Sequence, residues 1–460
     1  MVTGTLSKPV KFYSEWHDPH GRIRPHYTAL ARATEDLGTE ALSQRWNTAS
    51  RQVELDAVTF YLDPGSYRAM PTDFLPRVIP VEHWESIAAG VSQRLRAINR
   101  FLLDLYNDGQ EVVPDEVIYT SQYFYPEVQG FRPPKDLFVH IYGIDLVHLG
   151  DGRYMVLEDN LRIPSGISYQ LKSVGMADAI FPEFSEEYDI LPYDIRDAYL
   201  GMFRSLTDNP EPVCVLLTDG KYGSAFFEHR YLSDLLGIPL VEGPDLYVGP
   251  DGHVYARTLD QDVQVDVIYR RVEDLDLFVP GLREAYLDGK VALVNGIGTG
   301  AADDKLVFLW VPQMIESYLG EAPVLEQAHS YNLADMDSRR HVMENLESLV
   351  IKTRQGYGGL GVFVMPDLGE SYKARVANNI LQNPLMFIAQ ETLDFSQHMV
   401  FNGDTARLEP HHIDLRVFAV QSGDGSVSVF PGGLTRVAQS GSRITNNSSG
   451  GLCKPTWVVR

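Results

Sequence analysis

The chain has 460 residues, more than one hydrophobic core usually organises, so two or three subdomains are expected. Apolar residues make up 44% and charged residues 22% of the chain, which are ordinary globular values and exclude widespread disorder. The net charge of −23 repels nucleic acid and anionic membranes, so neither is an expected partner.

The cysteines and the first residues indicate a compartment. Cys214 and Cys453 are too few for a disulfide framework or a cysteine-rich zinc site, and they fit a reducing cytoplasm. The opening residues lack the apolar segment of a signal peptide, and no run of about 18 apolar residues could span a membrane. We therefore expect a soluble, cytoplasmic protein, whose oligomeric state the sequence does not indicate.

Residues 1–135 are expected to form an N-terminal region with a long helix. "AVTFYLDP" predicts a short strand that ends at Pro64. Between Pro80 and Asn107, apolar residues recur every three or four positions and form one helical stripe. The Pro-rich, acidic stretch from Glu111 to Lys135 predicts a connector.

Residues 136–175 contain a predicted hairpin, "GIDLVHLGDGRYMVLEDNLRIPSG". Asp151 and Gly152 both tolerate positive φ and are typical of a two-residue type I′ turn. With that turn, Asp145 lies directly opposite Glu158. Asn160 shares the face of Glu158, because side chains alternate along a strand.

Two carboxylates in this arrangement predict a cation between them. Directly opposed Cβ atoms are about 4.5–5.5 Å apart, where like charges are destabilising. Mg²⁺ prefers oxygen ligands and is commonly held by one or two carboxylates together with phosphate and water. Asp145, Glu158 and Asn160 are therefore candidate metal ligands. The alternative is an exposed hairpin whose acids face water.

Residues 176–300 alternate between strand and helix patterns. "VCVLLTD", "IPLVEG", "VDVIYRR" and "VALVNG" read as strands, and "GSAFFEHRYLSDLLG" has helical spacing with a glycine stop. Strands alternating with helices indicate an α/β layer with a largely parallel sheet.

Residues 301–460 are expected to hold a helix around Val307–Leu319 and then mainly strands. In "LVIKTRQGYGGLGVFV", Lys352 lies near the end of a strand, before a loop rich in glycine. Backbone N–H groups of such a loop can bind an anion, and a nearby lysine adds a charge for phosphate. A glycine-rich hairpin with a surface lysine is the alternative. Neither a Walker A nor a Rossmann motif fits, because a strand follows the glycines.

Charged residues recur in the later strands. "MFIAQETLDF" is an apolar strand that ends in Gln390 and Glu391. In "HHIDLRVFAV" the side chains of Asp414 and Arg416 share a face, and "PGGLTRVA" adds Arg436. An arginine in apolar sequence needs a partner, and phosphate or carboxylate suits its two-pronged geometry. The alternative is an internal Asp414–Arg416 salt bridge.

Together these segments resemble the circularly permuted ATP-grasp family over most of the chain, from about Phe12 to the end. "YMVLEDNLRIPSGISY", "LTDGKYGSAFFEH", "GTGAADDK", "IAQETL", "DLRVFAV" and "PGGLTRVA" look like its segments in its order. The metal hairpin precedes the nucleotide-binding segments, whereas it follows them in ordinary ATP-grasp enzymes. The resemblance implies a circularly permuted α/β (α+β ATP-grasp) fold. It adds an α/β pre-ATP-grasp layer and a helical N-terminal region.

The resemblance also implies roles for the candidate residues. ATP would be bound through phosphate and adenine contacts by Lys305, Lys352, Gly356, Gly358, Gly359, Gly361, Gln390 and Glu391. Mg²⁺ would be held by Asp145, Glu158 and Asn160. The transferred phosphoryl group and the substrate would be contacted by Arg416, Arg436, Arg162 and Ser165.

The implied function is that of an ATP-dependent carboxylate–amine ligase. A carboxylate would become an acyl-phosphate, and an amine would displace the phosphate to give an amide or peptide bond. The alternatives are a small-molecule kinase of the same fold and a nucleotide-binding regulatory module without turnover. The chain departs from the family pattern at His148, where close members have arginine, and in "NNSSGG". The sequence therefore does not identify the carboxylate or the amine.

Overall fold

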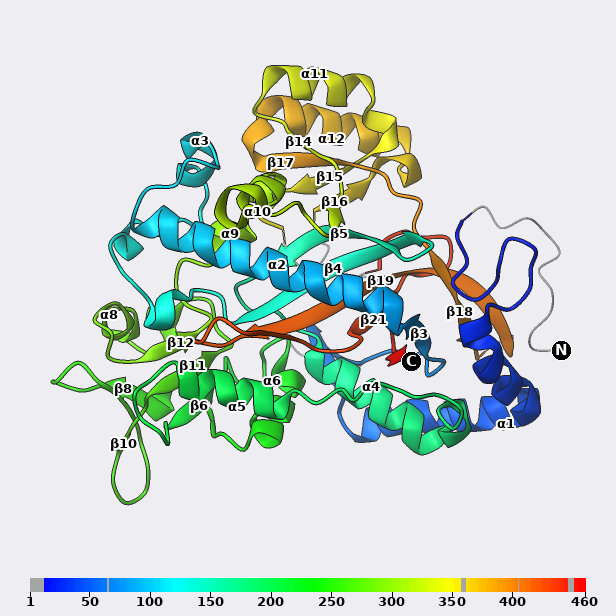
Figure 1. The fold of residues 1–460 in the computed structure, drawn as a ribbon, viewed down its shortest axis with the longest axis horizontal. Helices are drawn as coiled ribbons and strands as arrows, with labels where there is room; N and C mark the ends of the chain where they lie inside the picture. The colour runs from blue at the N-terminus through cyan, green and yellow to red at the C-terminus, as the bar shows by residue number, and fades with distance from the viewer. Residues whose placement is uncertain (1–11, 64–65, 357–360, 404, 446–450) are drawn as a thin grey trace.

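The computed structural model describes residues 12–63, 66–356, 361–403, 405–445 and 451–460 (Figure 1). Within them the largest sheet, called here the large sheet, has eight strands. Its order is β13-β5-β4-β19-β21-β22, and β18 and β20 also pair with β19. Their bounds are Ile141–Gly150 (β4), Arg153–Asn160 (β5), Glu326–Gln327 (β13), Gln397–Asn402 (β18), Arg407–Gln421 (β19), Val427–Val429 (β20), Leu434–Val437 (β21) and Leu452–Lys454 (β22).

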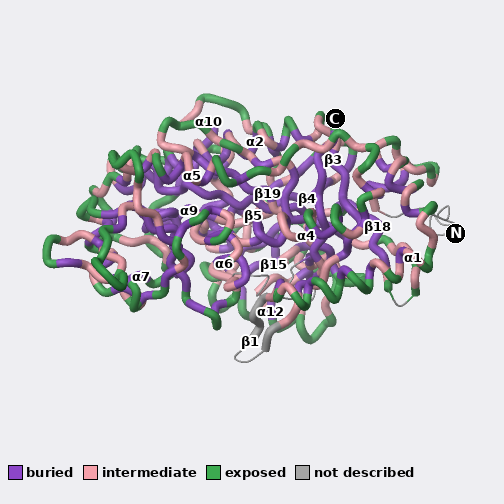
Figure 2. The backbone as a smooth tube through the Cα atoms, turned by 90° about the horizontal axis from the view of Figure 1, so that it is seen from below, coloured by how far each residue is buried: buried purple, intermediate pink, exposed green. Residues whose placement is uncertain are grey.

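The centre of the large sheet joins early and late parts of the chain. β4 pairs antiparallel with β19, so that Asp145 lies opposite Arg416 although 271 residues separate them. In Figure 2 the tube is buried along β4 and β19 and becomes exposed in the outer turns. The hairpin and the C-terminal strands therefore form one continuous layer.

The two faces of β19 pack against different cores. Leu415 and Val417 belong to the cluster that contains the apolar residues of α2 (Val81–Tyr106). Phe418 and Val420 belong to the cluster of α1 (Thr28–Leu55) and α4 (Ile167–Ile180). Because side chains alternate along a strand, Asp414 and Arg416 lie on the face opposite α2.

The predicted parallel sheet is confirmed. It has the order β12-β11-β6-β7, with every pair parallel. The strands are Cys214–Leu217 (β6), Leu240–Val241 (β7), Val267–Arg270 (β11) and Ala292–Val294 (β12). The helices around it are Arg196–Ser205 (α5), Phe226–Leu236 (α6), Leu275–Phe278 (α7) and Leu282–Leu287 (α8). Beside it projects a ribbon of Leu246–Val248 (β8), Val254–Ala256 (β9) and Val263–Gln264 (β10) (Figure 1).

A further sheet, with the order β14-β17-β15-β16, lies under two helices at the top of Figure 1 and is called here the small lobe. It contains Ser330–Asn332 (β14), Leu349–Thr353 (β15), Val362–Val364 (β16), Phe387–Glu391 (β17), Met336–Glu344 (α11) and Glu370–Gln382 (α12). Mainly strands follow Leu319, as expected, but the helices α11 and α12 of this lobe were not predicted. The apolar stripes are narrow, because α11 buries Val342 while α12 buries Val376 and Ile380.

Some of the remaining elements were predicted, but the helices α1 and α4 were not. The expected helix at 307–319 is a 3₁₀ turn followed by Val311–Leu319 (α10), after the short Gly300–Asp303 (α9). The connector contains Asp115–Tyr119 (α3). Thr59–Asp63 (β1) pairs with Ser66–Ala69 (β2), and Arg77–Pro80 (β3) pairs with Thr456–Val459 (β23) near the C-terminus. Within the described residues, every helix is too short or too polar to cross a bilayer.

The hairpin of β4 and β5 has the predicted turn and a more complex register. Asp151 and Gly152 both have positive φ, at 49° and 78°. Asp145 pairs with Glu158 as predicted, but Leu146 pairs with Val156, one residue out of the simple register. An extra residue on β4 near the turn is compensated by an extra residue, Leu157, on β5. The two irregularities cancel, so the carboxylates still face each other.

Candidate active site

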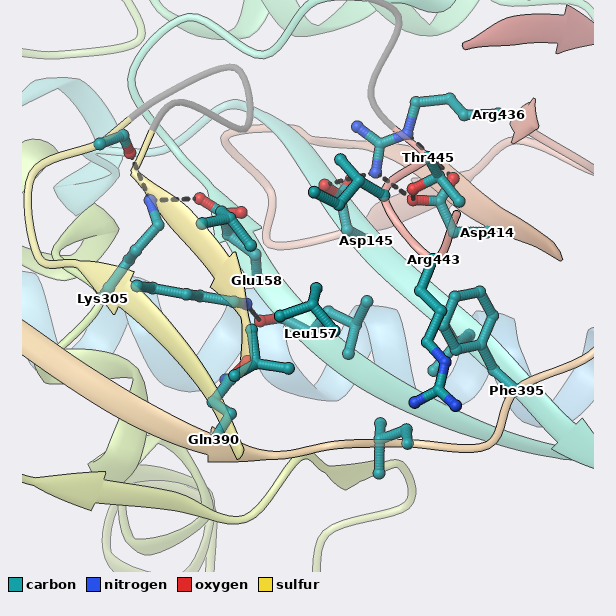
Figure 3. Close-up of a pocket in the computed structure, with 18 of the residues that line it drawn as sticks. Asp145, Leu157, Glu158, Lys305, Gln390, Phe395, Asp414, Arg436, Arg443 and Thr445 are labelled. Atoms are coloured by element: carbon teal, nitrogen blue, oxygen red, sulfur yellow. Dashed lines mark hydrogen bonds and ion pairs between the residues drawn. The ribbon is translucent and has the colours of Figure 1, made fainter. Parts of the chain in front are cut away.

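One pocket brings most of the predicted site residues together, between the large sheet and the small lobe (Figure 3). The predicted residues that line it are Asp145, Glu158, Asn160, Arg162, Lys305, Lys352, Gly356, Gln390, Glu391, Arg416 and Arg436. They come from six separate stretches of sequence. Convergence of charged residues from distant segments is what a ligand site requires and what an exposed hairpin would not produce.

A row of charges crosses three neighbouring strands of the large sheet. Glu158 on β5 faces Asp145 on β4, which faces Arg416 on β19. The Arg416 Nε and Nη2 atoms donate to the two oxygens of Asp145 at 2.6 and 2.8 Å. Register between the strands thus sets which charges meet.

The next row holds Arg436 and Asp414, which are also cross-strand partners. Arg436 donates to both Asp414 oxygens at 2.9 and 2.6 Å, and also to Asp145 at 2.8 Å. Thr445 donates a further hydrogen bond to Asp414. The alternative interpretation of an Asp414–Arg416 pair is wrong, because Arg416 bonds to Asp145 and Asp414 bonds to Arg436.

These contacts fix the ionisation of Asp145. Burial alone would raise the pKa of its carboxyl, but the guanidinium groups of Arg416 and Arg436 hold that pKa well below its ordinary value. Asp145 is 4% exposed. It therefore stays a carboxylate across the neutral range and serves as the shared counter-charge of both arginines.

The lysines meet Glu158 on the other side of the pocket. Lys305 Nζ lies 2.6 Å from Glu158 Oε1 and 2.5 Å from the Gly356 carbonyl oxygen. Burial opposes ionisation of Glu158, but the charges of Lys305 and Lys352 lower the pKa of its carboxyl. Burial lowers the pKa of Lys352 to about 8, an effect that Glu158 partly offsets. A buried lysine with its charge only partly balanced is well suited to an added anion.

The β5 irregularity contributes directly to this site. Leu157, the extra residue of β5, lines the pocket, and its carbonyl oxygen accepts a hydrogen bond from Lys352 Nζ at 3.4 Å. An extra residue in a strand re-aims neighbouring groups and is common beside functional sites. A regular hairpin would have turned this carbonyl elsewhere, and no residue pattern had predicted the bulge.

The glycine-rich loop is described only at its ends. Gly356 lines the pocket, whereas Gly358 and Gly359 lie outside the described residues. Gly361 does not line the pocket and has a φ of +79°, and a Cβ there would lie 2.1 Å from Thr353 Oγ1. A positive φ combined with that close approach requires glycine where β16 begins.

The strand β17 supplies the wall beside Lys352. Gln390 is 3% exposed and donates to Ser330 Oγ at 3.0 Å. The Glu391 carboxylate accepts a hydrogen bond from Tyr331 at 3.1 Å and remains exposed. Both line the pocket, followed by Thr392, Leu393 and Phe395. The mixed apolar and polar character of this wall suits a flat heterocycle with hydrogen-bonding edges.

Arg162 and Ser165, which follow the hairpin, are placed differently. Arg162 lines the pocket and is held by Asp303 at 2.7 Å and Glu273 at 3.1 Å. Ser165 does not line the pocket, because its hydroxyl accepts from Arg271 at 2.5 Å. Its carbonyl oxygen accepts from Arg416 Nη1 at 3.1 Å. Ser165 therefore contacts a site arginine through its backbone only.

The predicted metal ligands fit a magnesium ion in type and number. No group of three or more His, Cys, Asp or Glu side chains gathers among the described residues, so no all-protein cage is present there. Mg²⁺ needs only one or two carboxylates when phosphate and water complete its shell. Glu158 and Asn160 line the pocket, and Oδ1 of Asn160, the atom that a metal would use, accepts a long hydrogen bond of 3.4 Å from Arg416 Nη2. Both oxygens of Asp145 are bonded to arginines.

Several residues of the site escaped sequence analysis. The Asp303 carboxylate accepts a hydrogen bond from Arg162, and Thr445 donates one to Asp414. Phe395 and Arg443 also line the pocket. Asp303 stands in "GTGAADDK", which carried no signal apart from the family resemblance. The segment around Arg443 and Thr445 has no strand or helix periodicity, so only three-dimensional contact reveals it.

The chain matches the family model described as circularly permuted ATP-grasp type 2 over residues 76–438. It is 38% identical to an uncharacterized protein of Synechocystis sp., with 98% of each chain covered. A Frankia casuarinae protein, provisionally named glutamate–cysteine ligase 2-2, is 36% identical; the match covers 97% of this chain but 54% of that one. Among solved structures, a glutathione synthetase-like effector of Globodera pallida has a TM-score of 0.62 at 14% identity. That match covers 93% of this chain and 99% of the effector, and it shows a shared fold.

Proposed function

Because this chain belongs to the circularly permuted ATP-grasp type 2 family, we propose that it is an ATP- and Mg²⁺-dependent ligase that joins a carboxylate to an amine. The observation that carries the proposal is the single pocket in which Glu158, Asp145 and Arg416 form a row beside Lys305 and Lys352. Phosphoryl transfer needs mainly positioning and charge neutralisation, which such a row supplies without a nucleophilic side chain.

In the proposed complex, Lys305, Lys352 and the loop that begins at Gly356 bind the triphosphate, and the β17 wall binds adenine. Glu158, Asn160 and Asp145 hold Mg²⁺, which supplies neutralisation of phosphate charge when bound. Arg416 bonds to both oxygens of Asp145, whereas Arg436 bonds to Oδ2 alone, so Oδ1 is freed for the metal when Arg416 turns toward the phosphoryl group.

The proposed reaction has two steps. A substrate carboxylate oxygen attacks the γ-phosphorus of ATP, the bond to the β–γ bridging oxygen breaks, and ADP leaves from an acyl-phosphate. Arg416 and Arg436 neutralise the charge on the transferred group. An amine nitrogen then attacks the acyl carbon, inorganic phosphate leaves, and the amine loses a proton. The product is an amide, and no covalent link to the protein forms.

The substrates are proposed to be small molecules of the amino-acid class. The Frankia relative's name describes a protein that uses glutamate and cysteine, and the matched part is about half of that chain. Glutamate is therefore the first carboxylate to test. Arg162, held by Asp303 at the pocket wall, is the proposed contact for a substrate carboxylate. Dependence on ATP favours a cytoplasmic site of action, as do the free thiols of Cys214 and Cys453.

The test is a reaction of the purified protein with ATP, Mg²⁺, glutamate and a panel of amines, analysed by mass spectrometry. A new amide with stoichiometric ADP and phosphate supports the ligase. A phosphorylated product would identify a kinase, and binding of ATP without ADP formation would identify a regulatory module. Either result overturns the proposal.

A matched pair of variants identifies the site of the reaction. Glu158→Gln removes the carboxylate proposed for the metal and should lower ATP turnover roughly 100-fold while the fold persists. Glu326→Gln, on the neighbouring strand β13 with its side chain 64% exposed, should leave turnover unchanged. Unchanged turnover in Glu158→Gln would remove the metal assignment.

A further inference from the structure

Arg443, between β21 and the C-terminal strands, occupies an unusual place in the pocket. Its side chain lines the cavity and is 18% exposed. Figure 3 shows the guanidinium beside Phe395 and turned away from the group formed by Arg436, Asp414 and Thr445. It thus belongs to the wall formed by residues 390–395 rather than to the rows of paired charges on the large sheet.

The other cations of the pocket are committed to oxygen partners. Arg162, Lys305, Arg416 and Arg436 each lie within 2.9 Å of a carboxylate oxygen, and Lys352 bonds to a carbonyl. Within the described residues, the nearest carboxylate to Arg443 is that of Asp394, at 3.7 Å, whose side chain is 72% exposed. An ion pair with so exposed a partner at that distance stabilises the position of the arginine little. The donors of Arg443 are therefore available to a ligand.

The guanidinium of Arg443 packs against the first of three aromatic rings that contact one another. Its Cζ lies 5.5 Å from the centre of the Phe12 ring, which contacts the His412 ring at 4.5 Å between centres. The His412 ring in turn lies 4.8 Å from that of Phe395. One side of Arg443 thus rests against Phe12, and the same side chain lines the cavity that residues 390–395 border.

We propose that Arg443 is a specificity residue that contacts the nucleoside of ATP and not its triphosphate, an inference that rests on the proposed function. A planar guanidinium can lie against a purine face or donate to sugar hydroxyl oxygens. Of the residues proposed to bind phosphate, Lys305 and Arg436 lie away from Arg443 in the pocket (Figure 3), and Lys352 extends from β15, the strand next to β17. Arg443 would therefore select a nucleotide over other polyphosphates.

The test compares two ligands, an ATP analogue and inorganic tripolyphosphate, by isothermal titration calorimetry. Arg443→Ala should weaken the ATP analogue about tenfold, the effect of a largely desolvated cation–ring contact, and change tripolyphosphate less than twofold. Arg443→Met, which keeps the apolar stem against Phe12, should behave likewise. Arg340→Ala, with a side chain 69% exposed on α11, is the control and should change neither ligand.

The other outcomes are equally decisive. Equal weakening of both ligands would assign Arg443 to phosphate, and an unchanged affinity for the ATP analogue would show no contact. A rise only in the KM of the substrate carboxylate would assign Arg443 to the acceptor. Each of these overturns the inference while the proposed function stands. If the wild-type protein bound tripolyphosphate and the ATP analogue with equal affinity, or bound neither ligand, this inference and the proposed function would both be overturned.

Discussion

Among single residues, Lys352 has an ionisation unlike that of a surface lysine. It is 8% exposed on β15, and burial lowers the pKa of its ammonium to about 8. Glu158 and Asp145 raise that pKa, while Lys305 and Arg436 lower it. The group is therefore charged at neutral pH but loses its proton more easily than an exposed lysine. A bound triphosphate would stabilise the charged form.

This ionisation predicts the pH dependence of ATP binding. In the free protein the protonated form of Lys352 predominates below its pKa and is lost as the pH rises through about 8. The dissociation constant for ATP should therefore be flat between about pH 6.5 and 7.5 and should rise above pH 8, by up to about tenfold per pH unit. Glu158 and Asp145 have lowered pKa values and stay ionised in this window.

The matched control is Lys352→Arg, which keeps a charge at every pH tested. Titration calorimetry on both proteins from about pH 6.5 to 9.5 measures the effect. The variant should bind ATP with little pH dependence. A wild-type curve that stays flat through pH 9, or a variant that loses affinity in parallel with it, would contradict the role of Lys352.

Among elements, strands were easier to predict than helices. The parallel strands β6, β11 and β12 are continuous apolar runs, and α2 has a full stripe of buried residues. The small-lobe helices α11 and α12 bury too few residues for a stripe to show. The β5 bulge left no sequence signal, because Leu157 simply continues the apolar run of Met155 and Val156. The prediction that Asp145 lies opposite Glu158 was still correct, because the extra residue on β4 and the extra residue on β5 cancel.

A buried ion pair connects the small lobe to the rest of the molecule. Arg354, two residues after Lys352, lies within 2.8 Å of both oxygens of Asp304, the residue before Lys305. Arg354 also donates to Thr120 and to the Val117 carbonyl in the connector. Arg354 and Asp304 are 2% and 1% exposed. This pair connects the segments that carry Lys305 and Lys352, the two lysines proposed to bind phosphate.

Removal of one partner of this pair should be costly. Arg354→Met leaves the Asp304 carboxylate buried without its cation and should lower the free energy of unfolding by about 3–5 kcal/mol. The double variant with Asp304→Asn should be more stable than the sum of the single changes implies, since no unpaired charge remains. Denaturant unfolding of the single and double variants measures this coupling. Additive losses would show that the pair does not act as a unit.

For the molecule as a whole, the arrangement depends on contacts between the ends of the chain. β4 lies beside β19, and β3 pairs with β23, so N-terminal and C-terminal segments complete each other's sheets. Local patterns cannot reveal such pairings, and neither of them was predicted from the sequence. The division at residues 135, 175 and 300 stays a prediction. Segments 136–175 and 301–460 share the large sheet.

A net charge of −23 makes this convergence a requirement for the proposed function. A protein with that charge repels ATP on average, so binding depends on cations gathered from distant parts of the chain. Lys305, Lys352, Arg416 and Arg436 reach one pocket only when the large sheet and the small lobe are both in place. The fold, rather than the composition, brings together the cations of the proposed anion site.

A crystal structure with a non-hydrolysable ATP analogue and Mg²⁺ tests this convergence most directly. The account predicts a triphosphate in contact with Lys305 and Lys352, and a metal ion bound by Glu158 and Asn160 with Asp145 beside it. A nucleotide bound elsewhere, with Glu158 still paired to Lys305 and no ion at the hairpin, would contradict the account.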